Sequence, residues 1–173
     1  MKWIWSFYLY SFLGFLLELC YARATGAKKQ DRKCRFFLPI CPVYGAGATA
    51  ISLLPPAIAA NPALLYLSSA ALATGTEYLA ALFYEKLWHV SFWDYSMLPG
   101  NIRGRVCIPF SLAWGFLGIA LVYWIHPILS ALTARIPDLL LLPVTLVFAV
   151  DFVLTGHVLR SNGSTESLRW YRE

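Results

Sequence analysis

Long apolar stretches separated by short polar segments dominate the pattern of this chain. Five of the stretches are long enough to be membrane-spanning helices, because such a helix needs about 20 mostly apolar residues. The expected spans are residues 3–21, 36–58, 62–84, 106–125 and 138–158. They predict an all-α fold, a polytopic transmembrane helix bundle over residues 1–158, followed by a cytoplasmic tail over residues 159–173.

The composition agrees with this pattern and excludes the main soluble classes. The 173 residues are 59% hydrophobic and 13% charged, whereas a soluble domain carries about 25% charged residues. Too few charged side chains remain to cover a soluble surface. A soluble enzyme, a secreted disulfide scaffold and a disordered tail protein are therefore excluded.

The basic residues predict how the helices are oriented, because Lys and Arg in short loops stay on the cytoplasmic side. With the loop at 23–35 inside and five alternating spans, all of the 14 Lys and Arg residues except Lys2 and Arg135 lie inside. The N-terminus is then outside and the C-terminus inside. The net charge of +5 is explained in the same way, so no nucleic-acid partner is expected. The pattern leaves open whether segment 128–134 is a further interfacial helix.

The four cysteines give no sign of a disulfide framework. Cys20, Cys34, Cys41 and Cys107 all fall at or near the predicted cytoplasmic side, where thiols stay reduced. No C-x-x-C spacing occurs in the sequence. We interpret the four as small buried side chains, and we expect no metal and no cofactor.

Three acidic residues fall within the apolar spans: Glu18, Glu77 and Asp151. A charge at the centre of a membrane helix costs about 2.5–3.5 kcal/mol on insertion scales, so such residues are candidates for a functional site. All three are predicted in the cytoplasmic half of the bundle. They indicate either a polar cavity that opens inward or hydrogen bonds that only hold the helices together.

Two further segments flank the predicted cavity. The segment 85–114 combines polar residues with aromatic anchors, which favours a loop folded against the membrane. Its Arg105 can point at the acids, bind a phosphate-like head group through its planar fork, or anchor the helix at the interface. Proline and glycines at 41–47 predict a broken or kinked helix, because irregular backbone at membrane depth needs cover from protein or water. The candidate cavity or substrate-binding residues are Glu18, Tyr44, Glu77, Glu85, Asp94, Tyr95, Asn101, Arg103, Arg105, Ser111 and Asp151.

Six motifs in these regions resemble a family of small bacterial multi-pass membrane proteins, the permease-like ABC-transporter type IV family. They are Y-S-F-L-G-F-L-L-E (Tyr10 to Glu18), C-P-V-Y-G-A-G (Cys41 to Gly47), G-T-E-Y (Gly75 to Tyr78), W-D-Y-S (Trp93 to Ser96), N-I-R-G-R-V-C (Asn101 to Cys107) and S-L-A-W-G (Ser111 to Gly115). The resemblance covers about residues 8–127 and implies transport across the bacterial cytoplasmic (inner) membrane. The sequence has no G-x-x-x-x-G-K-[ST] phosphate loop, so any ATPase is expected to be a separate subunit.

Three functions are compatible with these features. The first is a permease-like component that moves a small solute or lipid head group through a cytoplasm-facing polar cavity, with proton or cation coupling through the acids. The second is an intramembrane enzyme acting on a lipid or lipid-linked phosphate substrate, so enzymatic activity stays open. The third is a non-catalytic membrane assembly subunit. Membrane lipids are expected partners, and five short spans favour a homo-oligomer in the first case.

Overall fold

The computed structural model describes residues 2–27 and 33–169, and within them the regular structure is helical, with no strand beyond one isolated bridge between Ile102 and Val106. The α-helices are α1 (Lys2–Ala24), α2 (Pro42–Ser52), α3 (Pro56–Ala59), α4 (Pro62–Phe83), α5 (Ile108–Ala120), α6 (His126–Thr133) and α7 (Leu141–Asn162). Two π-helical turns, η1 (Tyr84–Trp88) and η2 (Leu121–Ile125), continue α4 and α5, and two 3-10 turns, η3 (Asp138–Leu140) and η4 (Thr165–Leu168), flank α7. The all-α expectation is confirmed.

Three helices of the described chain are long and apolar enough to cross a membrane: Lys2–Ala24, Ile108–Thr133 and Asp138–Asn162. In the second of these, α5, η2 and α6 follow one another without a break, so segment 128–134 extends a long helix. Helix α4 has 22 residues, or about 33 Å, but its Ser, Thr, Tyr and Glu residues make it less apolar. The count of five spans and the orientation of the termini stay predictions.

The range 36–58 differs most from its expected form. In place of one long helix it contains α2, with 11 residues, and α3, with 4 residues. At 1.5 Å per residue α2 is about 16 Å long, which is roughly half of the hydrocarbon core. Pro42 occupies the first turn of α2 and Pro56 the first turn of α3, where a proline without an N–H is tolerated. The prolines therefore divide this range into short helices.

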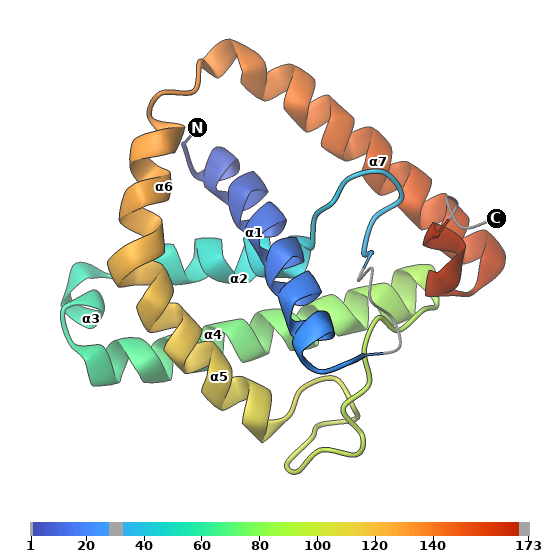
Figure 1. The fold of residues 1–173 in the computed structure, drawn as a ribbon, viewed down its shortest axis with the longest axis horizontal. Helices are drawn as coiled ribbons and strands as arrows, with labels where there is room; N and C mark the ends of the chain where they lie inside the picture. Colours follow the sequence, from blue (N-terminus) through green and yellow to red (C-terminus); the bar gives the residue numbers. More distant parts are fainter. Residues whose placement is uncertain (1, 28–32, 170–173) are drawn as a thin grey trace.

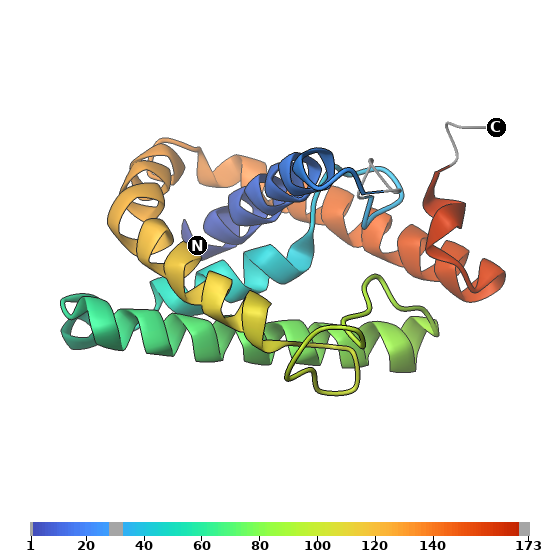
Figure 2. The ribbon, with the colours of Figure 1, turned by 60° about the horizontal axis from the view of Figure 1, so that its bottom comes forward.

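The helices cross one another rather than running parallel. In Figure 1, α4, the α5–α6 helix and α7 form the three sides of an open triangle, and α1 and α2 cross its interior. In the turned view of Figure 2, α4 lies along one side of the molecule, and α2 lies between it and α1. Helix α2 is therefore the central element, with α1 on one side and α4 on the other.

Small residues set the closest helix contacts. A Cβ atom added to Gly45 of α2 would overlap Ser11 Oγ of α1 and lie 2.6 Å from the Phe7 carbonyl oxygen. At the α4–α5 contact, a Cβ atom on Gly118 would overlap the side chain of Ser69. Small side chains let membrane helices approach closely, so that packing and hydrogen bonds can join them. These contacts hold α1 against α2 and α4 against α5.

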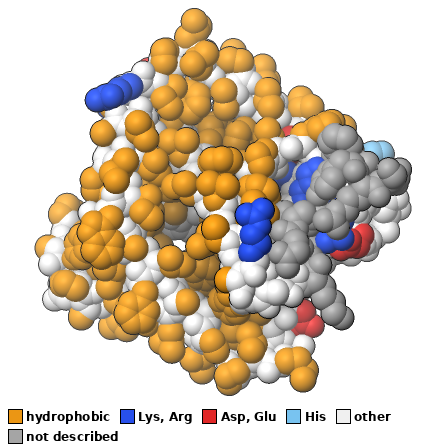
Figure 3. Space-filling model, in the orientation of Figure 1, with side chains coloured by type: hydrophobic (Ala, Val, Ile, Leu, Met, Phe, Trp, Pro, Cys, Tyr) orange, Lys and Arg blue, Asp and Glu red, His pale blue; other side chains and the backbone are white. Residues whose placement is uncertain are grey.

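The outside of the molecule is strongly apolar. Hydrophobic side chains cover most of the face in Figure 3, while the charged side chains visible there gather mainly toward the C-terminal end of α7. Only 28%, 17% and 17% of the three membrane-length segments is buried within the chain. Apolar surface of this extent indicates contact with lipid or with another chain.

Candidate functional site

Five residues from separate parts of the chain form what we call the acid–aromatic cluster: Glu18, Tyr44, Glu77, Tyr95 and Trp114. The Tyr44 hydroxyl donates to Glu18 Oε1 at 2.6 Å. The Tyr95 hydroxyl donates to Glu77 Oε1 at 2.9 Å, and Trp114 Nε1 donates to Glu77 Oε2 at 3.0 Å. The Tyr44 and Trp114 rings meet edge to face, with centroids 5.6 Å apart, an arrangement favoured by aromatic pairs. The cluster therefore joins α1, α2, α4, α5 and the loop before α5.

The close contact of α1 and α2 places Glu18 and Tyr44. Ser11, Gly14 and Glu18 recur at steps of three and four residues, so they share one face of α1. Without a side chain, Gly14 leaves room for Tyr44, whose Cβ and ring atoms occupy the space that a Cβ on Gly14 would fill. The next residue of α2, Gly45, lies directly over Ser11. The glycines of both motifs thus bring the Tyr44 hydroxyl to the Glu18 carboxylate.

Both acids of the cluster lie partly or almost wholly inside the protein. Glu77 is 6% exposed, and each of its carboxylate oxygens accepts a hydrogen bond. Glu18 is half-buried. Two like charges repel more strongly in a low-dielectric interior than in water. The cluster therefore joins two acidic side chains from separate helices in one network of hydrogen bonds and ring contacts.

The loop between η1 and α5 supplies Tyr95. Asp94 accepts hydrogen bonds from Ser96 N at 2.9 Å and Ser96 Oγ at 3.1 Å, and Asn101 Oδ1 accepts one from Gly104 N at 3.2 Å. The Tyr95 amide donates to the Gly104 carbonyl at 2.7 Å. Asp94 and Asn101 thus fold the loop itself and do not contact the acids of the cluster.

The folded loop fixes Tyr95 as a hydrogen-bond donor. Its ring stacks on Phe110 of α5 at 4.8 Å between centroids. Burial raises the pKa of Tyr95, and the nearby Glu77 carboxylate raises it further. The hydroxyl therefore stays protonated and donates to Glu77, closing the cluster from the loop side.

Arg105 and Glu85 pair with each other near the base of this loop. Arg105 Nε lies 3.0 Å from each Glu85 carboxylate oxygen, and Arg105 Nη2 donates to Glu85 Oε2 at 2.6 Å. The guanidinium also lies over the Tyr78 ring, 5.4 Å from its centroid. These hydrogen bonds lower the pKa of Glu85 and raise the pKa of Arg105. Arg105 is thus bonded to Glu85, and no hydrogen bond joins it to the acids of the cluster.

Asp151 lies apart from the other two membrane acids. Its Oδ1 accepts from the Phe37 amide at 2.7 Å and from the Leu38 amide at 3.4 Å. One turn later, Thr155 Oγ1 accepts from the Phe36 amide at 3.0 Å. Asp151 and Thr155 therefore attach α7 to the segment before α2. The expected layer of three acids is divided, with Glu18 and Glu77 together and Asp151 elsewhere.

Two remaining candidates have other surroundings. Ser111 Oγ accepts from Thr74 Oγ1 at 2.8 Å and donates to the Cys107 carbonyl at 3.0 Å, so it strengthens the α4–α5 contact. Arg103 is exposed on the loop in a left-handed conformation, with φ of 52°. Neither side chain hydrogen-bonds to an acid of the cluster.

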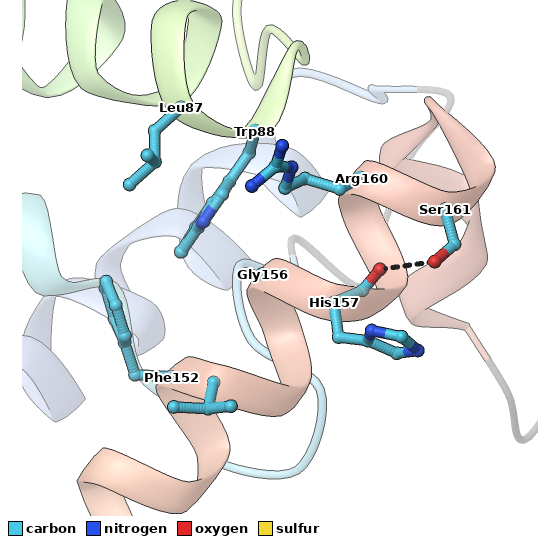
Figure 4. Close-up of a pocket in the computed structure, with 8 residues that line it drawn as sticks. Leu87, Trp88, Phe152, Gly156, His157, Arg160 and Ser161 are labelled. Carbon is cyan, nitrogen blue, oxygen red and sulfur yellow. Dashed lines mark hydrogen bonds between the residues drawn. The ribbon is translucent and has the colours of Figure 1, made fainter.

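Two hollows open beside α7. The larger, which we call the α7 groove, has a volume of about 650 Å³ and lies between α1, α2, α4 and α7. The smaller, of about 450 Å³, lies between η1 and the end of α7; in Figure 4 its Trp88 lies beside Gly156 and its Arg160 extends toward Trp88. Neither hollow is lined by Glu18, Glu77 or Asp151. Among the described residues no group of three or more His, Cys, Asp or Glu could hold a metal ion.

Sequence reasoning missed three features of these regions. Trp114 is part of the S-L-A-W-G motif, and its indole N–H in the middle of an apolar helix needs an acceptor. Arg35 was counted only as an inside charge, yet it is buried beside α7. Cys34 and Cys41, separated by seven residues, bring their sulfur atoms to 2.7 Å, which no sequence spacing indicated.

Comparison with known families gives one match, to the family described as "Putative ABC-transporter type IV", over residues 5–156. The searches of curated proteins and of solved structures found no match. The matched range contains the acid–aromatic cluster and the loop that closes it, and it extends past the expected residues 8–127 to include Asp151. Since it covers most of the 173 residues, the chain belongs to the ABC-transporter type IV family.

Proposed function

We propose that the protein is a permease-like membrane component of an ABC-type transporter, and that Glu18 and Glu77 form its polar site. The family and the three membrane-length helices make it a transporter-like membrane protein. The observation that carries the proposed site is the acid–aromatic cluster, in which the contact of the Tyr44 and Trp114 rings links the hydrogen-bonded carboxylates of α1 and α4 although 58 residues separate them in the chain. Intramembrane acids that share one site are typical of ion and proton pathways.

The proposed site depends on the charge of its two carboxylates and on a loop that opens it to the cytoplasm. With both carboxylates ionised, their repulsion favours a proton or another cation between them. Tyr95 is the only member of the cluster that belongs to a loop, so a movement of that loop withdraws one donor from Glu77 and opens the site on the cytoplasmic side. The transported species is then a small solute or a lipid head group whose passage is coupled to the cation.

Energy from ATP enters through a second subunit. The sequence has no phosphate-binding loop of the G-x-x-x-x-G-K-[ST] type. The expected ATPase docks on the cytoplasmic side, where the loop carrying Tyr95 lies in the predicted orientation. The apolar outer surface also supports association of the chain with copies of itself in the membrane.

The test measures proton flux in proteoliposomes that contain the protein and a trapped pH-sensitive dye, after a potassium diffusion potential is imposed. We expect Glu18→Gln and Glu77→Gln each to lower the proton flux to a tenth of the wild-type value or less, because the amide side chain cannot carry a proton. Glu85→Gln is the matched control, since Glu85 pairs with Arg105 outside the cluster. Unchanged flux in both folded cluster variants would refute the proposed site.

A structural role is the second candidate function. Both acids of the cluster already accept hydrogen bonds within the chain, as expected of a polar contact that only joins helices. In that case each Gln variant loses stability and activity together, whereas the proposed site predicts folded variants without flux. The enzyme hypothesis requires a positively charged site beside the acids that can bind the phosphate of the substrate. Arg105 is the candidate for that role, and it is instead paired with Glu85.

A further inference from the structure

One arginine is buried beside α7 without full compensation. Arg35 is 7% exposed, and its guanidinium carbon lies 4.9 Å from the centroid of the Phe152 ring and 5.9 Å from that of the Trp88 ring. Its Nη1 has no hydrogen-bond partner in the described part of the chain. A buried guanidinium donor without an acceptor carries a substantial desolvation cost. Such a group is stabilised by a further hydrogen-bond acceptor, and most strongly by an anionic one.

Asp151 does not supply that partner. Asp151 Oδ1 is used by the amides of Phe37 and Leu38. Its Oδ2 has no hydrogen-bond partner within residues 2–27 and 33–169, and no hydrogen bond joins it to Arg35 Nη1. The Asp151 carboxylate lowers the net positive charge of the region, but it leaves the Arg35 donor unused.

Arg35 lines the α7 groove, whose other walls are mainly apolar. Thr145, Phe148 and Phe152 follow one another at three and four residues, so they line the groove from one face of α7. From Thr145 to Phe152 this face is about 10 Å long. Arg35 lies at the Phe152 end, and Tyr8 closes the other end by donating a hydrogen bond to Thr145 Oγ1 at 2.9 Å. The groove therefore combines one cation with an apolar channel.

We propose that the α7 groove binds a membrane phospholipid, with its phosphate on Arg35 and one acyl chain along α7. The planar guanidinium matches phosphate oxygens bidentately, and a thin hydrocarbon chain fits a groove with a single charge at one end. The groove opens among membrane-length helices, where lipid is the surrounding solvent. This site does not include Glu18 or Glu77, so it goes beyond the proposed transport function.

The first test uses native mass spectrometry of the detergent-solubilised protein, titrated with phosphatidylglycerol or with diacylglycerol of the same chains, which lacks the phosphate. We expect one tightly bound phosphatidylglycerol and an affinity for it about tenfold above that for diacylglycerol. Arg35→Gln removes this preference, while Arg103→Gln, on the exposed loop, keeps it. Equal binding of both lipids to the wild-type protein would overturn the proposal.

A second pair of variants tests the groove without removing a buried group. Ala149 lines the groove and is exposed, and its neighbour Val150 is 58% exposed and does not line it. Ala149→Phe should fill the acyl channel and lower phosphatidylglycerol binding about tenfold, whereas Val150→Phe should leave it unchanged. Unaltered binding in Ala149→Phe would contradict the proposed path of the chain. Loss of lipid binding on dimerisation would assign the groove to a second copy of the protein instead.

Discussion

Replacing Gly45 by alanine should separate α1 from α2 and thereby weaken the acid–aromatic cluster. The new Cβ would overlap Ser11 Oγ and lie 2.6 Å from the Phe7 carbonyl oxygen, which is a backbone atom and cannot rotate away. Overpacking of this kind costs about 1–3 kcal/mol, and the better helix propensity of alanine returns about 0.5–1 kcal/mol. The expected net loss in the free energy of unfolding is therefore up to about 2.5 kcal/mol, with a central value of about 1 kcal/mol.

The assay is SDS-induced unfolding from mixed micelles, followed by far-ultraviolet circular dichroism. Gly75→Ala is the matched control, because no atom lies within 4 Å of a Cβ added at Gly75 of α4. This control should be neutral or should stabilise the protein by up to about 1 kcal/mol. If Gly45→Ala were as stable as Gly75→Ala, the described contact of α1 with α2 would be wrong.

Three further predictions concern the cluster and its loop. Trp114→Phe keeps an aromatic ring but removes the hydrogen-bond donor to Glu77, so the free energy of unfolding should fall by about 0.5–2 kcal/mol. In a double-mutant cycle, the same change should have little effect in a Glu77→Gln background. Arg105 lowers the pKa of Glu85, so the ion pair stabilises the protein above the ordinary pKa of Glu85, and this stabilisation is lost as pH falls through the lowered pKa. The difference in unfolding free energy between wild type and Glu85→Gln, measured across pH, should therefore vanish only at strongly acidic pH. Gly104→Ala should loosen the loop, because φ at Gly104 is +71° and a Cβ costs about 1–2 kcal/mol there; faster amide hydrogen exchange at Tyr95 would show it.

The sequence predicted the helical membrane-type fold, and it predicted that Glu18, Glu77 and Asp151 lie in one polar layer; ring and hydrogen-bond contacts join Glu18 and Glu77 in one cluster. Glu18 and Glu77 both lie in apolar helices beside small residues. An acidic side chain in a membrane helix faces the interior of the bundle and bonds to polar groups there. These features were accessible because each depends on local composition and on helical periodicity. The proline and glycines at 41–47 predicted a broken helix, whereas α2 begins at Pro42 and is regular through Gly47, so the irregular backbone lies before this segment.

The features that the sequence did not predict depend on contacts between residues far apart in the chain. Asp151 was expected beside the other acids because it lies at a similar depth, but depth does not determine which side of a helix faces which neighbour; α7 instead contacts the segment before α2. The sequence left several roles open for Arg105, among them pointing at the acids, and it did not indicate that Glu85 lies in a π-helical turn with its carboxylate at the guanidinium. The short α2 was missed because an apolar run alone cannot distinguish one long helix from two short ones.

The central claim is that Glu18 and Glu77 act as one site, and a double-mutant cycle in the proton-flux assay tests it most directly. Residues that act as a unit are non-additive. We predict that the double variant Glu18→Gln with Glu77→Gln has the same residual flux as either single variant. If the two losses multiplied, or if neither variant changed the flux, the two carboxylates would not form one functional site.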